Sequence, residues 1–255
     1  MKAIQGIAIY VLWLRELKRL LRARSRLIGT LLMPLFFLAF MGLGFQRMRF
    51  PGMPGTEYSD FLLPGILGMS ILFSSAFTGL SVLWDREFGF LKEIMVAPVS
   101  RVSIVLGRIA GGITTSLFQA LAILAVSLAF GFRPRQWVMM FPALLLMVLI
   151  SITFIGLGLS FASNMRDMQG FNLVMNFVIF PLFFLSGALF PLDDFPSWVR
   201  AVARLDPLAY GVDGLRAALL GSSDMSLAFN LIALAIFSLL AVALGVWFFE
   251  KSDSL

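Results

Sequence analysis

The chain of 255 residues contains no cysteine and no histidine, and only 13% of its residues are charged. Catalytic triads, thiol chemistry, disulfides and zinc or haem sites with His or Cys ligands are therefore excluded. A soluble domain carries roughly 25% charged and roughly 45–50% apolar residues. Here 60% of the residues are hydrophobic and the mean hydropathy is +0.94. This surplus of apolar residues indicates a membrane protein.

Six apolar runs contain none of the 20 basic and 14 acidic residues. They cover 27–45, 61–84, 109–130, 137–163, 170–190 and 226–249. A helix needs about 20 residues to cross a bilayer, and its backbone polar groups must pair internally. The sequence therefore predicts an all-α membrane protein with six transmembrane helices in a single domain, 1–255.

The basic residues predict the orientation. With the N-terminus inside, 13 of the 20 basic residues lie in inner segments. These segments are 1–26, 85–108, 164–169 and 250–255. Since cytoplasmic loops are enriched in Lys and Arg, we expect a multi-pass protein of the cell (inner or plasma) membrane with both termini cytoplasmic. The net charge of +6 then reflects contact with membrane lipid and not with nucleic acid.

Residues 1–26 combine a basic face and an apolar stripe at helical spacing. The basic face contains Arg15, Lys18, Arg19, Arg22 and Arg26. The stripe contains Ile4, Ile7, Val11, Leu14, Leu17 and Leu21. This pattern predicts an interfacial helix with its basic face toward anionic headgroups. The same charges also serve simply to set the topology.

The predicted inner loop 85–108 begins with helical character over 85–96. Its apolar face contains Phe88, Leu91, Ile94 and Met95, and charged contacts are offered by Arg86, Glu87, Lys92 and Glu93. Gly89 interrupts the pattern, and Pro98 would end the helix near Val96. Such a helix either fills a groove of a partner protein or lies on the membrane surface. Its composition favours neither.

A break in the fifth apolar run leads into the predicted outer region, 191–225. The residues that break the run are Ser186, Gly187 and Pro191. Two short helices are expected beyond it, with Pro196 and Pro207 in their first turns and Asp206 as a cap. Because they are too short to span, they would lie flat or dip in as re-entrant helices.

Each of these two helices has its own apolar stripe. The stripes are Trp198, Val199, Val202 and Leu205, followed by Leu208, Val212, Leu215 and Leu219. Asp213 and Arg216 are spaced for an ion pair. The region would either cover an exit or anchor the protein at the interface, with Trp198 and Tyr210 as belt aromatics.

Uncharged polar side chains occur within the predicted spans. Ser74, Ser75 and Thr78 on the second span are candidates for a substrate path. Asn172 and Asn176 share a face of the fifth span. Such carboxamides more often bond to neighbouring helices than bind substrate. The absence of charge within the spans argues against ion coupling and is compatible with an apolar, amphipathic or lipid-linked cargo.

The chain also lacks a G-x-x-x-x-G-K-[ST] phosphate loop. If transport is driven by ATP, the ATPase is a separate polypeptide. A self-sufficient secondary transporter or channel is the alternative, although no inverted repeat is evident. An intramembrane enzyme ranks last, because no group is available for general acid–base chemistry.

The order of these elements resembles the membrane subunit of type-2 ABC exporters, the family of drug-resistance and polysaccharide or nodulation-factor export permeases. The resemblance covers essentially the whole chain, and its most specific stretches are REFGFLKEIMVAPVSR (86–101) and the outer segment 186–221. The positions that match the family pattern are Glu87, Gly89, Pro98, Ser100, Ser186, Gly187, Pro191, Pro196, Pro207 and Arg216.

The resemblance implies a permease powered by a separate ATPase, with two copies of each subunit in the working unit. ATP and Mg would be bound by the partner, and no cofactor or metal is expected in this chain. The implied coupling helix would contact the ATPase through Arg86, Glu87, Gly89, Leu91, Lys92, Ile94, Met95 and Pro98. The implied outer gate would contain Ser186, Gly187, Pro191, Trp198, Pro207, Tyr210 and Arg216. Export by alternating access is implied only by the resemblance, because the physical argument leaves the direction open.

Overall fold

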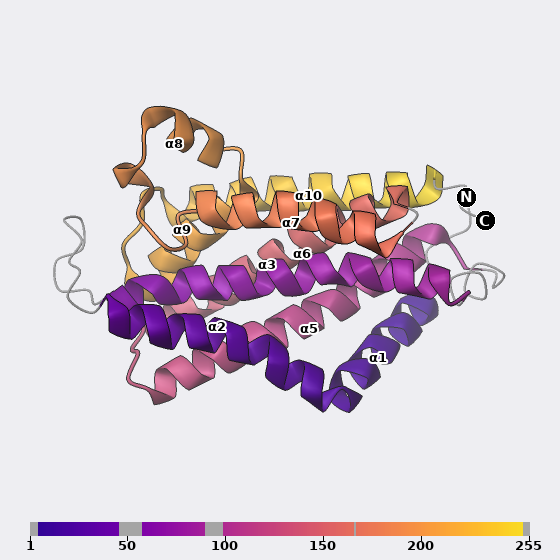
Figure 1. Cartoon of the computed structure of the whole chain (residues 1–255), viewed down its shortest axis with the longest axis horizontal. Helices are drawn as coiled ribbons and strands as arrows, with labels where there is room; N and C mark the ends of the chain where they lie inside the picture. Colours follow the sequence, from indigo (N-terminus) through magenta and orange to yellow (C-terminus); the bar gives the residue numbers. More distant parts are fainter. Residues whose placement is uncertain (1–4, 46–57, 90–98, 166, 252–255) are drawn as a thin grey trace.

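The computed structural model describes residues 5–45, 58–89, 99–165 and 167–251. Within these ranges the chain is helical and contains no strand. Long helices lie side by side in a bundle, α1 meets them obliquely near one end, and α8 projects at the other (Figure 1). The predicted all-α architecture is therefore confirmed.

The elements differ mainly in length. The α-helices are α1 (Gly6–Arg22), α2 (Arg24–Gly44), α3 (Tyr58–Glu87), α5 (Arg101–Ala129), α6 (Met140–Asn164), α7 (Met168–Leu185), α8 (Ser197–Ala203), α9 (Pro207–Leu220) and α10 (Leu227–Lys251). Two 3-10 turns, η1 (Trp137–Met139) and η2 (Leu192–Asp194), precede α6 and α8. Five helices are long and apolar enough to cross a membrane, and Ile28–Gly44 of α2 is a shorter apolar helix. These six match the six predicted spans.

Helix α3 lies at the centre of the bundle, in contact with α2, α5, α6, α7 and α9. It approaches α6 very closely, because a Cβ added to Gly79 would overlap the carbonyl group of Gly158. Such small residues let helix backbones meet where lipid gives no hydrophobic driving force between helices. This side of α3 is therefore packed without room for side chains.

The two ends of the bundle are held by different contacts. At one, the α1 end, the Gln5 amide donates to the Ser103 hydroxyl (2.9 Å) and the Arg101 guanidinium donates to the Glu250 carbonyl. At the other, the α8 end, the Tyr58 hydroxyl donates to the Leu189 carbonyl (3.2 Å). The start of α1 and the end of α10 therefore share one end of the bundle, as six spans require.

The predicted inner loop 85–108 is shorter in the structure. Helix α3 continues to Glu87, and α5 already begins at Arg101, capped by the Ser100 hydroxyl. A continuous helix over 85–96 is wrong, because the chain turns after Glu87 and Gly89 adopts a left-handed φ of +75°. Residues 90–98, with Leu91, Lys92, Ile94, Met95 and Pro98, lie outside the described residues.

The α8 end also departs from prediction. Helix α7 stops at Leu185, because Gly187 is left-handed (φ +74°). Pro196 is the N-cap of α8 instead of its first residue. On α8, Val199 and Ala203 are buried, whereas Trp198, Val202 and Leu205 are exposed.

Helix α9 does not lie flat on the surface. It is wedged among α3, α6 and α10, and nearly every residue from Pro207 to Leu219 is buried. The expected Asp213–Arg216 pair is also absent, since the two side chains bond to different partners. Asp213 accepts from the Asp224 and Met225 amides and from Asn230, while Arg216 donates to the Gly187 carbonyl. Amphipathic spacing failed here because residues on all sides of α9 meet protein.

Candidate functional site

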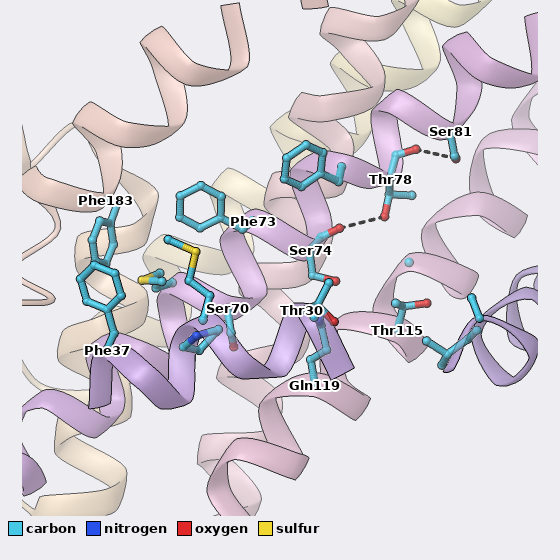
Figure 2. A pocket seen from close by; sticks show the side chains of 18 of the residues that line it. Thr30, Phe37, Ser70, Phe73, Ser74, Thr78, Ser81, Thr115, Gln119 and Phe183 are labelled. Carbon is cyan, nitrogen blue, oxygen red and sulfur yellow. Dashed lines mark hydrogen bonds between the residues drawn. The ribbon is translucent and has the colours of Figure 1, made fainter. Parts of the chain in front are cut away.

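A cavity of about 460 Å³ lies between α2, α3, α5 and α7, and the end of α1 closes part of its rim. Its walls are mostly apolar, with Phe37, Phe73 and Phe183 among the residues that face it (Figure 2). The Phe73 ring meets those of Phe180 and Phe183 edge-on, with centroids 5.4 and 6.4 Å apart. The cavity can therefore accept an apolar group against aromatic surface.

Hydroxyl groups of α3 form a polar track along this cavity. Ser70, Ser74, Thr78 and Ser81 line it at helical spacing. Thr78 donates to the Ser74 carbonyl (3.3 Å) and Ser81 to the Thr78 carbonyl (2.7 Å), as Figure 2 shows. Because Ser70, Thr78 and Ser81 already donate to carbonyls of their own helix, they mainly offer acceptor oxygens to a ligand.

Two carboxamides line the cavity without a protein partner. Gln119 of α5 is only 4% exposed, and its Oε1 atom is buried with no hydrogen bond. Asn176 of α7 also lines the cavity and makes no hydrogen bond within the described residues. The buried amide oxygen of Gln119 is costly without a partner, whereas the exposed carboxamide of Asn176 can bond to a ligand or to water.

Gln119 is not among the residues predicted from the sequence to line a substrate path. The signal was present, because Gln119 is the only carboxamide in the predicted span 109–130. Of the predicted path residues, Ser74, Thr78 and Asn176 line the cavity. Ser75 does not, since it is fully buried on another side of α3.

Asn172 and Asn176 do not bond to neighbouring helices as expected. Both are exposed on α7, and neither forms a hydrogen bond in the part of the chain that the structure describes. Asn176 borders the cavity, whereas Asn172 does not line it. Two carboxamides facing hydrocarbon would lose hydrogen bonds to water without replacement.

A buried ion cluster joins three helices at the α1 end. Arg15 of α1 donates to both carboxylate oxygens of Asp85 on α3, at 2.8 and 3.1 Å. Arg108 of α5 pairs with the same carboxylate and donates to the Ser81 hydroxyl (3.1 Å). These bonds raise the pKa of Arg15 despite the opposing effect of its burial. The cluster is not predicted from the sequence, which indicated a loop at both Asp85 and Arg108.

Of the predicted coupling residues, the structure describes those nearest α3. Arg86 and Glu87 form the last residues of that helix, and Glu87 is exposed. Gly89 follows in a left-handed turn. Arg86 and Glu87 therefore follow Asp85 directly in the same helix.

At the α8 end, the predicted outer residues Ser186, Gly187 and Arg216 belong to a bonded turn against α3. Arg216 of α9 donates to the Gly187 carbonyl (2.6 Å), and its guanidinium lies 3.9 Å from the centre of the Phe61 ring. Ser186 donates to the Phe183 carbonyl (2.7 Å). A Cβ at Gly65 would overlap the backbone of Ala188, so this turn sits directly on α3.

The remaining predicted outer residues differ in how far they are buried. Pro207 is the first residue of α9, and Tyr210 is buried with its hydroxyl bonded to the Arg204 carbonyl (2.7 Å), so it is not a belt aromatic. Pro191 is half-buried, whereas Trp198 is 69% exposed and suits an interfacial position. Asp206 caps α9 by accepting from the Leu208 amide, and burial raises its pKa to about 8.

Known proteins are similar in sequence to this chain over nearly its whole length. Residues 7–220 match the ABC-2 type transporter family. The chain is 29% identical over 241 residues to the inner membrane transport permease YadH of Escherichia coli K12, an alignment that covers 93% of this chain and 92% of that protein. It is 29% identical over 230 residues to nodulation protein J of Rhizobium leguminosarum bv. trifolii, which covers 89% and 84%.

Proposed function

Because the chain belongs to the ABC-2 type transporter family, we propose that it is the membrane subunit of an ATP-driven exporter. It would act in the inner membrane and move an apolar, amphipathic or lipid-linked substrate out of the cytoplasm by alternating access. ATP and Mg would be bound by two copies of a separate ATPase subunit. The α1 end would face the cytoplasm, because the predicted inner segments hold most of the basic residues.

The cavity between α2, α3, α5 and α7 is the observation that carries this proposal. It combines aromatic walls with neutral hydrogen-bonding groups, and beyond Glu16 and Arg19 at its rim its described lining contains no charged residue. A site of this kind binds an apolar body and orients it through a few polar groups. The cavity has no feature suited to ion coupling, so the energy must reach it from elsewhere.

The end of α3 is the route by which we expect that energy to arrive. Glu87 is exposed where the ATPase would bind, and Asp85 two residues earlier is bonded to Arg15 and Arg108. Movement of this end would therefore be shared among α1, α3 and α5. All three contribute to the lining of the cavity.

A second copy of the permease would cover the exposed face of α7. Asn172 and Asn176 lie there without hydrogen-bond partners, one and two turns into a membrane helix. A protein surface can satisfy these carboxamides, and lipid tails cannot. The cavity would then open toward the seam between the two copies.

Affinity purification of the tagged chain from its native membrane tests the proposal. We expect an ATPase with a Gly-rich phosphate loop to copurify, and Glu87→Lys to reduce its recovery at least tenfold without loss of folded permease. Asp193→Lys is the matched control, because Asp193 is an exposed carboxylate at the α8 end. Transport by the purified chain with no ATPase bound would overturn the proposal.

A further inference from the structure

Two hollows of the molecule adjoin each other at α1. The first is the cavity described above. The second is a depression of about 650 Å³ along α1, called here the basic depression, whose described lining is Val11, Leu14, Arg15, Lys18, Arg19, Arg22 and Ala23. Arg19 and Ala23 line both hollows. A molecule longer than either one can therefore occupy both.

The cations of the basic depression are not equally available. Arg15 is bonded to Asp85, and Arg19 lies 4.0 Å from the Glu16 carboxylate with its guanidinium 5.4 Å from the Trp84 ring. Lys18 and Arg22 are exposed and form no ion pair or hydrogen bond with any described residue. They follow each other at i, i+4 on one face of α1 and present two uncompensated positive charges.

The cavity beyond Arg19 has the opposite character. Its aromatic walls and the carboxamides of Gln119 and Asn176 suit an apolar chain with a polar linking group. The combined site is therefore cationic at one end and apolar at the other. A cationic amphiphile would be repelled at Lys18 and Arg22, and an uncharged one would leave both charges unused.

We propose that this site binds an amphiphile with a phosphate- or carboxylate-bearing head and an apolar tail. Lys18, Arg19 and Arg22 hold the anionic head, the tail lies along the aromatic walls, and Gln119 bonds to a polar group that joins the two. The inference rests on the proposed function and specifies the class of its substrate. It also gives the basic face of α1 a role beyond setting the topology.

Binding of dodecyl phosphate to the purified permease in phosphatidylcholine nanodiscs tests the proposal. We expect dodecyl phosphate to bind at least tenfold more tightly than dodecyltrimethylammonium. Inorganic phosphate should bind at least tenfold more weakly than dodecyl phosphate, because it has no tail for the cavity. Equal affinity for the cationic amphiphile, or for free phosphate, would overturn the proposal.

Variants locate the bound molecule. The double variant Lys18→Gln/Arg22→Gln should weaken dodecyl phosphate binding at least tenfold. Arg204→Gln, which removes an exposed cation at the α8 end, should leave it unchanged. Ser74→Phe, which fills the cavity, should weaken binding to a similar extent. If Ser74→Phe had no effect, the probe would be a lipid on the surface of α1 and the proposal would be wrong.

This measurement uses the permease alone and needs no ATPase. Its failure would leave the copurification result untouched, and the substrate class alone would have to be revised. Conversely, the absence of an ATPase partner would overturn the proposed function whatever the affinity for dodecyl phosphate.

Discussion

Two sides of α3 show how one helix serves two purposes. Toward α6 and the α8-end turn it presents Gly65 and Gly79, where even a methyl group would overlap a neighbouring backbone. Toward the cavity it presents Ser70, Ser74 and Thr78 beside open space. The closed side fixes the helix in place, so that the open side keeps a constant shape for a ligand.

Ser74 and Ser75 make the contrast most direct. They are adjacent and chemically identical, yet Ser74 lines the cavity and Ser75 is 0% exposed. Composition cannot separate them, because helix geometry alone turns them about 100° apart. The difference teaches that a serine in a membrane helix has meaning only through the side on which it lies.

The largest effect is expected on the closed side, where α3 packs against α6. Gly79→Val should abolish accumulation of folded protein, a loss of more than about 4 kcal/mol, because the obstacle is the Gly158 backbone and no rotamer avoids it. Size-exclusion profiles of a fluorescent fusion would measure this. Gly29→Ala is the control, since it lines the cavity and a Cβ there has no neighbour within 4 Å. Normal folding of Gly79→Val would show that the two sides do not differ in packing.

A smaller effect is expected at the ion cluster that follows the cavity-lining Ser81 on α3. Asp85→Asn leaves Arg108, whose side chain is 2% exposed, without its counter-charge. We expect destabilisation of roughly 3 kcal/mol, because an unpaired buried charge costs more than the pair contributes. Thermal unfolding in detergent would measure it, with the exposed Glu87→Gln as control. Equal melting temperatures for the two variants would contradict the buried cluster.

Paired substitution of the two serines sharpens the comparison itself. Ser75→Phe should destabilise the protein by about 2 kcal/mol through overpacking, whereas Ser74→Phe should change stability by less than about 1 kcal/mol. Ser74→Phe should instead abolish transport, because the new ring occupies the cavity. Unfolding curves and transport assays on both variants give the two readouts. The same outcome for both serines would mean that the cavity is not the path.

The membrane spans could be predicted from the sequence. Which side of each helix faces the cavity could not. Charge-free runs of about 20 residues reveal membrane helices because bilayer thickness sets their length. The predicted path residues Ser74, Thr78 and Asn176 could be named because polar groups in such runs are rare. Ser75 was included wrongly, since apolar surroundings hide the periodicity that normally separates the inner face of a helix from its outer face.

The contacts of buried charged residues were the main feature that could not be predicted from the sequence. Asp85 and Arg108 flank predicted spans and looked like ordinary loop residues, yet they belong to long helices and bond across the bundle. Arg216 and Asp213 were spaced for an ion pair. In the structure Arg216 instead donates to the Gly187 carbonyl, and Asp213 accepts from Asn230. A single sequence shows which charges are near in the chain and not which helices will meet.

The smallest expected effect concerns Asp206, at the start of the tightly packed α9. Burial raises its pKa from 3.8 to about 8, although the bond from the Leu208 amide opposes the shift. Between these pH values the folded state keeps a proton that the unfolded state releases, so stability should fall as pH rises from 5 to 8. We expect a loss of about 1 kcal/mol for each pH unit in this range, or about 3 °C in melting temperature per unit. Asp206→Asn keeps the cap and should remove this slope, because its amide does not titrate. An identical pH dependence in the variant would show that Asp206 is charged in the folded protein and that this closed region admits water.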